Sequence, residues 1–255
     1  MTISIITATY NSADTLAATF DSILSQDYAD YEVIVQDGQS NDGTLDIIRT
    51  YEQLFEGRMK WQSMPDGGIY DGFNKGCMRA NGDVIGYLNS DDMFASPNVL
   101  STIAQAYTAH PDVDAVYADV VYVPATNPNK IVRYYCSKKF KPSRMKMGYI
   151  PAHPTLYIKA ECYKKYGYYD TQFKLAADFE YILRLIYINN IKTLYIPQTW
   201  VKMRMDGATT KGIRSHIQIV KDHFNAFRKH GITINPFLYF WRYAEKLLEF
   251  RIFNQ

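Results

Sequence analysis

Aspartates are the residues in the first hundred positions whose types and spacing could do chemistry. They stand directly after predicted β-strands, at Asp37, Asp66, Asp91 and Asp92. Few lysines or arginines lie among them in the sequence, and crowded carboxylates are costly without a counter-charge. A hard divalent cation, Mg²⁺ or Mn²⁺, is the simplest counter-charge, because it prefers oxygen ligands and commonly bridges phosphates. One aspartate after a strand is usually a turn residue or helix cap, so only the coincidence of four predicts a metal-dependent phosphate site.

Apolar runs and amphipathic segments alternate through the same region, and this alternation positions the aspartates. The expected strands are at 3–8, 31–35, 61–64 and 84–88, and the expected helices are at 12–24, 42–54, 70–80 and 99–107. Strands that alternate with helices predict an α/β fold with a doubly wound, mainly parallel sheet and right-handed crossovers. Ligands bind beyond the carboxyl ends of such strands, so we expect the four aspartates and the turn at 7–11 at one edge.

The second half of the chain has a less regular pattern. We expect strands at 113–123, 131–135, 155–158, 193–196 and 200–205, and helices at 178–188, 211–230 and 236–253. No repeat or linker interrupts this order, which predicts one domain followed by a helical tail.

Several nucleotide-binding classes are disfavoured by missing signatures. No Gly-x-Gly-x-x-Gly follows the first strand, as a dinucleotide-binding dehydrogenase would need, and no P-loop is present. The three cysteines form no Cys-x-x-Cys pair, which favours a reducing compartment over a disulfide framework or a zinc site. No apolar stretch approaches the about 18–20 residues of a membrane span. We therefore expect a cytoplasmic protein that is soluble or peripheral at the inner face of the membrane.

Five segments resemble family 2 glycosyltransferases and follow one another in the family's order. They are IITATYN (5–11), QDGQSNDGT (36–44), GIYDGFNKG (68–76), GYLNSDD (86–92) and AADFEYILRL (176–185). The resemblance implies a GT-A fold, a nucleotide-diphosphate sugar donor, a divalent metal and inversion at the anomeric carbon. We then expect a GT-A domain at 1–210, made of a donor nucleotide-binding half (1–95) and an acceptor half (96–210). A C-terminal helical extension would occupy 211–255.

The resemblance also implies where the nucleotide lies. The base, most often uracil, would contact Asp37 and the main chain of Thr7, Ala8, Thr9 and Tyr10. The chemistry agrees, since a carboxylate can accept the imide N–H of uracil while main-chain groups read its carbonyls.

Further donor contacts follow from the same resemblance. Asp66 would support the base or ribose, Asp91 would lie near the ribose and donor sugar, and Asp92 would ligate the metal between the two phosphates. The family usually has Asp-x-Asp here, so the adjacent pair leaves open which aspartate ligates the metal. Asn74 and Lys75 would contact the donor, with an exposed polar helix face as the alternative.

Asp178 matches the family's position for the general base. Inverting transfer needs one carboxylate that takes the acceptor hydroxyl's proton while the diphosphate leaves from the opposite face. The alternative is that Asp178 only caps its helix, where the dipole also favours a negative charge. His153, flanked by two prolines, is expected as an acceptor contact, with a structural histidine as the alternative.

A loop at 205–210 resembles the family's flexible loop that closes over the donor. Lys211 and Arg214 follow it and would steady the departing diphosphate. His216 would be a further metal ligand, as a late histidine is in some relatives. An ordinary strand-to-helix turn is the alternative.

The net charge of +2 hides two halves of opposite sign. Residues 1–129 hold 18 acidic and 5 basic residues, whereas 130–255 hold 8 acidic and 23 basic ones. Seven cations fall within 130–146, and an aromatic helical stripe runs through 237–248. We expect the basic half to contact a saccharide or lipid-linked saccharide acceptor, or an anionic membrane surface, rather than nucleic acid. The alternatives are a solvated basic face, and a stripe that packs on its own domain or forms a homodimer.

Two other functional classes stay open at this point. A nucleotidyltransferase acting on sugar phosphates would use similar carboxylates, although the turn after the first strand lacks the basic, glycine-rich loop it usually needs. A non-catalytic nucleotide-sugar-binding module would keep Asp37 but has no reason to keep Asp92 and Asp178 together.

Overall fold

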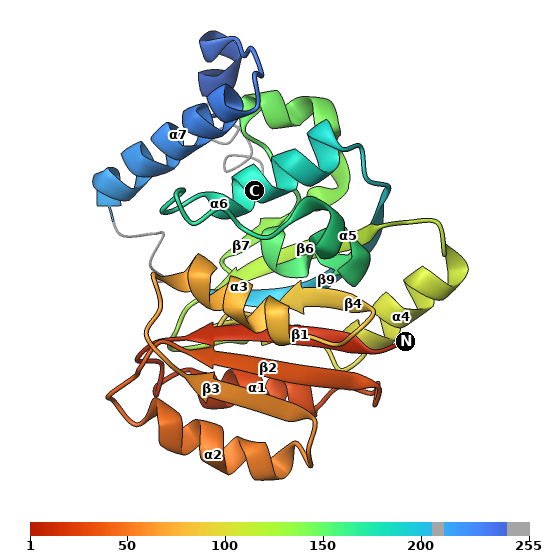
Figure 1. Ribbon diagram of the computed structural model, residues 1–255, viewed down its shortest axis with the longest axis vertical. Helices are drawn as coiled ribbons and strands as arrows, with labels where there is room; N and C mark the ends of the chain where they lie inside the picture. Colours follow the sequence, from red (N-terminus) through yellow and green to blue (C-terminus); the bar gives the residue numbers. More distant parts are fainter. Residues whose placement is uncertain (206–211, 244–255) are drawn as a thin grey trace.

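One mixed sheet crosses the molecule in the computed structural model, which describes residues 1–205 and 212–243 (Figure 1). Its strands in these residues are β1 (Ile3–Thr9), β2 (Tyr31–Asp37), β3 (Met59–Ser63), β4 (Val84–Tyr87), β5 (Met93–Phe94), β6 (Ala115–Val123), β7 (Arg133–Tyr135), β8 (Tyr157–Lys159) and β9 (Thr193–Arg204). Their order is β3-β2-β1-β4-β8-β6-β9-β5, and β7 pairs with β6. The predicted α/β class is confirmed.

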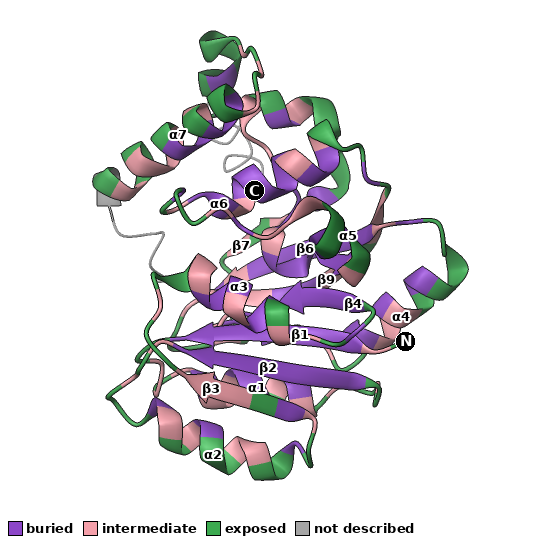
Figure 2. Cartoon of the chain, in the orientation of Figure 1, coloured by how far each residue is buried: buried purple, intermediate pink, exposed green. Residues whose placement is uncertain are grey.

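The first half of the sheet is parallel, as the alternation predicts. β1 pairs in parallel with β2 and β4, and β2 pairs in parallel with β3. Thr9 lies opposite Asp37, so the carboxyl ends of β1 and β2 are level. β1 and β2 are buried along their whole length, because helices or other strands cover both faces (Figure 2).

The second half mixes directions. β6 and β9 are parallel, whereas β8 is antiparallel to both β4 and β6, and β5 and β7 are antiparallel additions. The two late strands that we expected are one strand, β9, whose register with β6 shifts between Tyr117 and Val120. The shift falls where β9 contains Pro197, which cannot donate to the ladder.

Helices cover the sheet on both faces. In the described residues they are α1 (Leu16–Leu24), α2 (Thr44–Leu54), α3 (Ile69–Arg79), α4 (Val99–Ala109), α5 (Ala160–Tyr166), α6 (Ala177–Ile182) and α7 (Gly212–Lys229). α6 continues as a π-helical turn, Leu183–Ile188, and a further helix occupies 236–243. The sequence pattern misses α5 and β5 because seven and two residues are too few to show a period.

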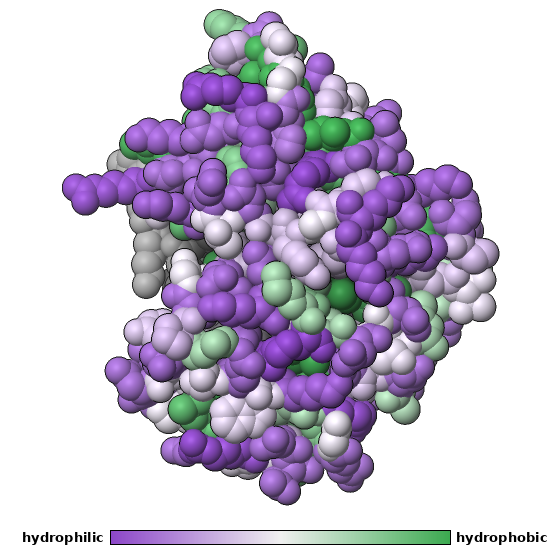
Figure 3. Space-filling model, viewed as in Figure 1, coloured by the Kyte–Doolittle hydropathy of each residue, from purple (hydrophilic) through white to green (hydrophobic). Residues whose placement is uncertain are grey.

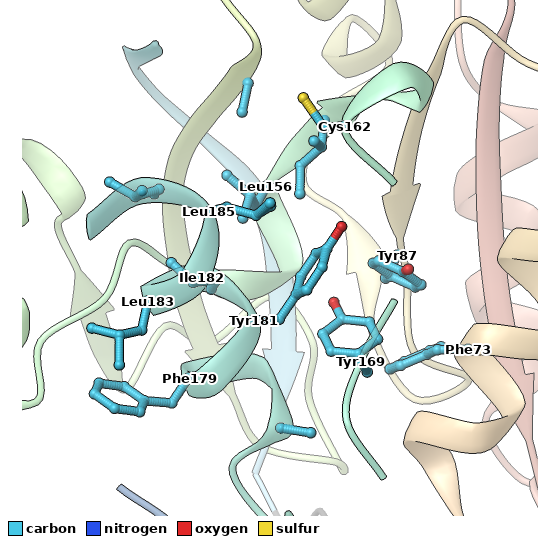
Figure 4. Close-up of a cluster of buried hydrophobic side chains, with 14 of the residues drawn as sticks. Phe73, Tyr87, Leu156, Cys162, Tyr169, Phe179, Tyr181, Ile182, Leu183 and Leu185 are labelled. Atoms are coloured by element: carbon cyan, nitrogen blue, oxygen red, sulfur yellow. The ribbon is translucent and has the colours of Figure 1, made fainter. Parts of the chain in front are cut away.

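The two faces of the sheet bury separate apolar cores. Ile3 and Ile5 of β1 pack on the side of α1 and α4, whereas Ile6 packs on the side of α3 and α6. α3 lies directly on β1, because a Cβ added at Gly76 would come within 2.5 Å of Ile6 Cγ2. Aromatic rings from α3, β4 and α6 meet in this second core (Figure 4). This packing fixes α3 between the strand ends and α6.

The C-terminal helices pack on the domain rather than apart from it. Phe227 of α7 lies edge-on to Phe179 of α6, with ring centroids 5.4 Å apart. The hydroxyl of Tyr239 forms a hydrogen bond with His223 Nδ1, and the two atoms lie 2.9 Å apart. The boundaries expected at residues 95 and 210 stay predictions. Within the described ranges, no helix is both long enough and apolar enough to cross a membrane.

Candidate active site

The loops that follow β1, β2 and β4 are fastened to one another. The N–H of Asn11 donates to Ser40 Oγ at 2.8 Å, and the N–H of Ser12 donates to Thr44 Oγ1 at 2.8 Å. Ser12 Oγ lies 2.9 Å from Ser90 Oγ, directly before the aspartate pair. The carboxyl ends of these three strands therefore meet at one edge, as predicted.

The turn after β1 offers mainly its main chain to a ligand. Thr7 Oγ1 donates to the carbonyl of Leu88 at 2.9 Å, and Thr9 is buried. Ala8 is buried under α3, whereas the ring of Tyr10 is 63% exposed. This arrangement suits the main-chain role that the resemblance implies for the turn.

Asp37 is fully buried at the end of β2. Its carboxylate accepts hydrogen bonds from the N–H and hydroxyl of Ser40 and from the hydroxyl of Ser63 at 2.6 Å. These three hydrogen bonds leave one acceptor site on Oδ1, but Asp37 is fully buried, so a nucleobase could reach it only if the loop with Ser40 or Ser63 moved aside. The expected contact between Asp37 and the base thus requires a local rearrangement.

Asp66 lies beside the end of β2. Its Oδ1 accepts the N–H of Gly68 at 2.9 Å, and its Oδ2 would lie 2.9 Å from a Cβ at position 38. The ring of Tyr10 approaches the same point to 3.4 Å. Only glycine at position 38 leaves room for both side chains, so Asp66 and Tyr10 flank Gly38.

Asp91 and Asp92 form a close pair after β4. Asp92 is 1% exposed and accepts a hydrogen bond from Asn89 Nδ2 at 2.8 Å. Burial raises the pKa of both carboxyls, and the charge of Asp91 raises the pKa of Asp92 further. Arg204, at the end of β9, acts in the opposite direction on both.

Arg204 is a counter-charge that the sequence pattern does not reveal. β5 pairs with β9 so that Met93 lies opposite Lys202, and the antiparallel register brings Arg204 beside the aspartates that precede β5. Few cations lie among these aspartates in the sequence, and the structure adds Arg204 from a distant strand. A long sequence separation hides the contact.

The four aspartates do not form one ligand cluster. The described part of the chain contains no group of three or more His, Cys, Asp or Glu side chains that could hold a metal ion. Asp37 and Asp66 are engaged with neighbouring loops, which leaves the pair Asp91-Asp92 as the candidate oxygen ligands. A buried and a half-buried carboxylate side by side fit Mg²⁺ or Mn²⁺, which one or two carboxylates and the phosphates of a substrate commonly hold together.

Three other candidates for the donor side lie near the start of α7. Arg214 and His216 are exposed on its first turns, and His216 joins no group of three metal ligands among the residues that the structure describes. Lys211 and the loop at 206–210 lie outside the described residues. The roles of these residues stay predictions.

Asn74 and Lys75 have contacts within the protein. Asn74 donates to the carbonyl of Tyr169 at 2.8 Å and accepts its N–H at 3.0 Å, and it is 8% exposed. Lys75 pairs with Asp71 at 2.8 Å and donates to the carbonyl of Pro65 at 2.8 Å. Asn74 therefore fastens α3 to the second half of the chain, and Lys75 fastens the loop before α3.

Asp178 lies half-buried in the first turn of α6, on the side of the site that faces α3. Ala176, not Asp178, occupies the N-cap position of the helix. Asp178 Oδ1 accepts hydrogen bonds from Tyr70 Oη at 3.1 Å and from the N–H of Phe179 at 2.8 Å. The residues before α6 are held in turn by α7, since Asp222 Oδ2 accepts the N–H of Leu175 at 2.9 Å. A carboxylate with an oriented side chain is therefore present where the resemblance implies the general base.

His153 lies close enough to Asp178 for the two to interact electrostatically. Its Nε2 is 2.7 Å from the hydroxyl of Tyr169, and its ring stacks on Tyr87 with centroids 6.0 Å apart. Burial lowers the pKa of His153, and the charge of Asp178 opposes this effect. These surroundings suit the acceptor contact expected of His153, which stays a prediction. The sequence pattern does not single out Tyr70 or Tyr169, which only the fold brings to this place.

Comparisons with known proteins place this site in a family. The model of "Glycosyl transferase family 2" matches residues 4–162. An uncharacterized glycosyltransferase of Mycobacterium tuberculosis is 32% identical over 193 residues, which are 72% of this chain and 68% of the relative. A PGL/p-HBAD biosynthesis glycosyltransferase of Mycobacterium bovis (strain BCG) is 29% identical over 181 residues, which are 71% of this chain and 68% of the relative.

Solved structures share the fold. S. aureus TarS in complex with UDP superposes with a TM-score of 0.70 at 19% identity and covers 89% of this chain, which in turn spans 65% of that chain. The mannosyltransferase PcManGT from Pyrobaculum calidifontis, in complex with GDP-Man and Mn²⁺, has a TM-score of 0.66 at 18% identity and covers 92% of this chain and 66% of its own.

The fold and the site define a GT-A glycosyltransferase. The chain belongs to glycosyl transferase family 2 and is an enzyme of the glycosyltransferase class. This membership favours sugar transfer over the nucleotidyltransferase and binding-module alternatives.

Proposed function

We propose that the protein is an inverting, metal-dependent glycosyltransferase that uses a nucleotide-diphosphate sugar, with a UDP-sugar as the donor. The acceptor is a hydroxyl of a saccharide or of a lipid-linked saccharide. The observation that carries the proposal is the oriented carboxylate of Asp178, which Tyr70 holds from the first turn of α3, just after the Asp66–Gly68 turn. TarS in complex with UDP-GlcNAc supports the donor class, and PcManGT in complex with Mn²⁺ supports the metal.

The transfer step requires one base from the protein. The acceptor oxygen forms a bond to the anomeric carbon, the bond from that carbon to the diphosphate breaks, and Asp178 takes the proton of the acceptor hydroxyl. Attack from the face opposite the leaving group inverts the anomeric centre. When bound at Asp92, with Asp91 beside it, Mg²⁺ or Mn²⁺ would neutralise charge on the leaving diphosphate.

The site residues divide between binding and chemistry in this proposal. The 7–10 turn, Asp66 and, after release from its serines, Asp37 bind the nucleoside. Arg214 and Lys211 approach the diphosphate, and His216 is a further metal ligand. His153 orients the acceptor hydroxyl toward Asp178.

A panel of nucleotide sugars with Mn²⁺ tests the proposal. Donor binding is measured by thermal shift, and turnover is measured as donor hydrolysis or transfer. The variant Asp178→Asn is expected to lose transfer while its donor affinity stays within a few-fold of wild type. If no nucleotide-diphosphate sugar binds the wild-type protein, the proposal fails, and full turnover by Asp178→Asn removes that residue from the mechanism.

The basic half of the chain supports an anionic partner in the same proposal. The turn at 142–147 lies against the 236–243 helix, because Arg242 Nη1 donates to the carbonyl of Gly148 at 3.0 Å. Exposed aromatic residues of that helix, Phe237 and Trp241, are 83% and 54% exposed. Apolar atoms gather at this end of an otherwise mainly hydrophilic face (Figure 3). Cations and exposed aromatic rings together suit an anionic lipid surface or a lipid-linked acceptor.

A further inference from the structure

The two oxygens of Asp178 have different surroundings. Oδ1 accepts both hydrogen bonds that the structure gives this carboxylate, from Tyr70 Oη and from the N–H of Phe179. The structure gives Oδ2 no hydrogen bond within the described residues. One oxygen is thus anchored by the protein, and the other is left for a substrate hydroxyl.

Tyr70 is itself held by a rigid element. It lies in the first turn of α3, which packs on β1 through Gly76 and is fastened to Tyr169 by Asn74. The ring of Tyr70 also lies 5.5 Å from the ring of Tyr169. The hydroxyl of Tyr70 is therefore placed by the packing of α3.

That hydroxyl has a choice of two acceptors. Its oxygen is 3.1 Å from Asp178 Oδ1 and 3.2 Å from the carbonyl oxygen of Leu175, and it has one proton to donate. An ionised carboxylate is the stronger acceptor, whereas a protonated one competes less well with a carbonyl. The carboxylate is thus the better partner of the two, and it holds the hydroxyl of Tyr70 at Oδ1.

We infer that Tyr70 is a positioning residue for the general base, holding Asp178 by Oδ1 so that Oδ2 receives the proton of the acceptor hydroxyl. This inference rests on the proposed role of Asp178. Tyr70 lies in the predicted donor half of the chain, whereas Asp178 lies in the predicted acceptor half, so the inference joins the two halves at the general base. Because Tyr70 follows the Asp66–Gly68 turn directly, the same loop that borders the nucleotide edge also sets the position of the base.

Other polar groups also face this region. Besides Tyr70, they are His153, Tyr169 and Asp222. Burial raises the pKa of both tyrosines well above their ordinary value, so they stay neutral. Asp222 is occupied by the N–H groups of Leu175 and Ala176 and by Gln218. His153 is the group that must be separated from Asp178 by experiment.

The variant Tyr70→Phe removes one oxygen atom and tests the inference. We expect kcat to fall about tenfold while the KM values for donor and acceptor stay within about twofold, because the carboxylate loses the hydrogen bond that orients Oδ2 and both substrates keep their own contacts. Tyr134→Phe is the matched control. It also removes a tyrosine hydroxyl from a buried aspartate, Asp119, but away from Asp178, and it should change none of the three quantities.

The same variants are then made in a His153→Gln background. A Tyr70→Phe fall in kcat of equal size there supports an effect through Asp178, whereas loss of the effect assigns it to His153 and overturns the inference. A rise in donor KM together with the fall in kcat marks the hydroxyl as merely structural and also overturns it.

Donor binding by calorimetry confirms that each variant is folded. If Asp178→Asn is inactive while Tyr70→Phe behaves as wild type, the inference fails and the proposed function stands. If Asp178→Asn turns over fully, both fail together.

Discussion

Asn74 of α3 and the main chain of Tyr169 exchange two hydrogen bonds, although the two residues lie 95 positions apart in the sequence. This contact joins the helix that follows the nucleotide edge to the segment that precedes α6. The position of Asp178 relative to the nucleotide edge therefore depends on the buried amide of Asn74.

Replacing Asn74 with alanine should destabilise the fold. The change leaves the N–H and carbonyl of Tyr169 buried without these partners, and we expect a loss of about 2–4 kcal/mol in the free energy of unfolding. Urea denaturation measures it. The matched control is Asn41→Ala at an exposed position, which should change the free energy by less than about 0.5 kcal/mol. Equal effects of the two changes would show that the Asn74 contact adds nothing.

Glu180 connects α6 to the end of α7 through buried charge. It is fully buried and lies 3.1 Å from Arg184 Nη2, 3.2 Å from Lys229 Nζ and 2.7 Å from His230 Nε2. Burial by itself raises the pKa of Glu180, but the hydrogen bonds and charges of Arg184, His230 and Lys229 outweigh it and lower the pKa below the ordinary 4.5. The ionised form thus stabilises the fold above that value, and this contribution is lost as the pH falls through the lowered pKa.

The variant Glu180→Gln should therefore lose about 3 kcal/mol at pH 7, since it leaves Arg184 and Lys229 without their buried partner. The difference from wild type should narrow as the pH falls below 4.5, because protonated Glu180 then resembles glutamine. Urea midpoints between pH 7 and pH 3.5 follow both effects, with the exposed Glu161→Gln as the control. A difference that stays constant with pH would contradict the charge assignment.

The pair Asp91-Asp92 should respond to divalent metal. Two carboxylates held together with Asp92 almost fully buried cost free energy in the absence of a cation, so Asp92→Asn is expected to raise the melting temperature of the metal-free protein. Mn²⁺ should raise the melting temperature of wild type and leave that of Asp92→Asn unchanged. The exposed Asp27→Asn serves as the control and should keep the wild-type response. A full Mn²⁺ response by Asp92→Asn would move the metal site elsewhere.

The basic run should govern binding to anionic vesicles. Replacing the exposed Lys138, Lys139, Lys141 and Lys146 with serine should weaken binding to phosphatidylglycerol vesicles by about tenfold or more, and should reduce its dependence on salt. A variant with four other exposed lysines replaced carries the same change of charge; these are Lys164, Lys165, Lys174 and Lys192. Vesicle sedimentation distinguishes the two. If both variants bind the vesicles equally well, the basic run is a solvated face. If binding appears only when the vesicles contain a lipid-linked saccharide, the basic run contacts the acceptor.

The local sequence pattern determined much of the fold of this protein and indicated its family. Strands and helices alternate through the first hundred residues, so period and turn residues predict the parallel half of the sheet and the meeting of its carboxyl ends. The five quoted segments indicate the family, and the family model confirms it. These features could be predicted from the sequence because each depends on residues that are neighbours in the chain.

Tertiary structure alone decided the contacts between distant segments. The neighbouring strand brings Arg204 to the aspartate pair, α3 brings Tyr70 to Asp178, and Ser40 and Ser63 enclose Asp37. None of these pairings leaves a period or a motif in the sequence, because side-chain contacts across a sheet or between helices depend on register and packing rather than on spacing. The sequence by itself therefore indicated which carboxylates are candidates for the chemistry, and the fold decided which neighbours hold, neutralise or cover them.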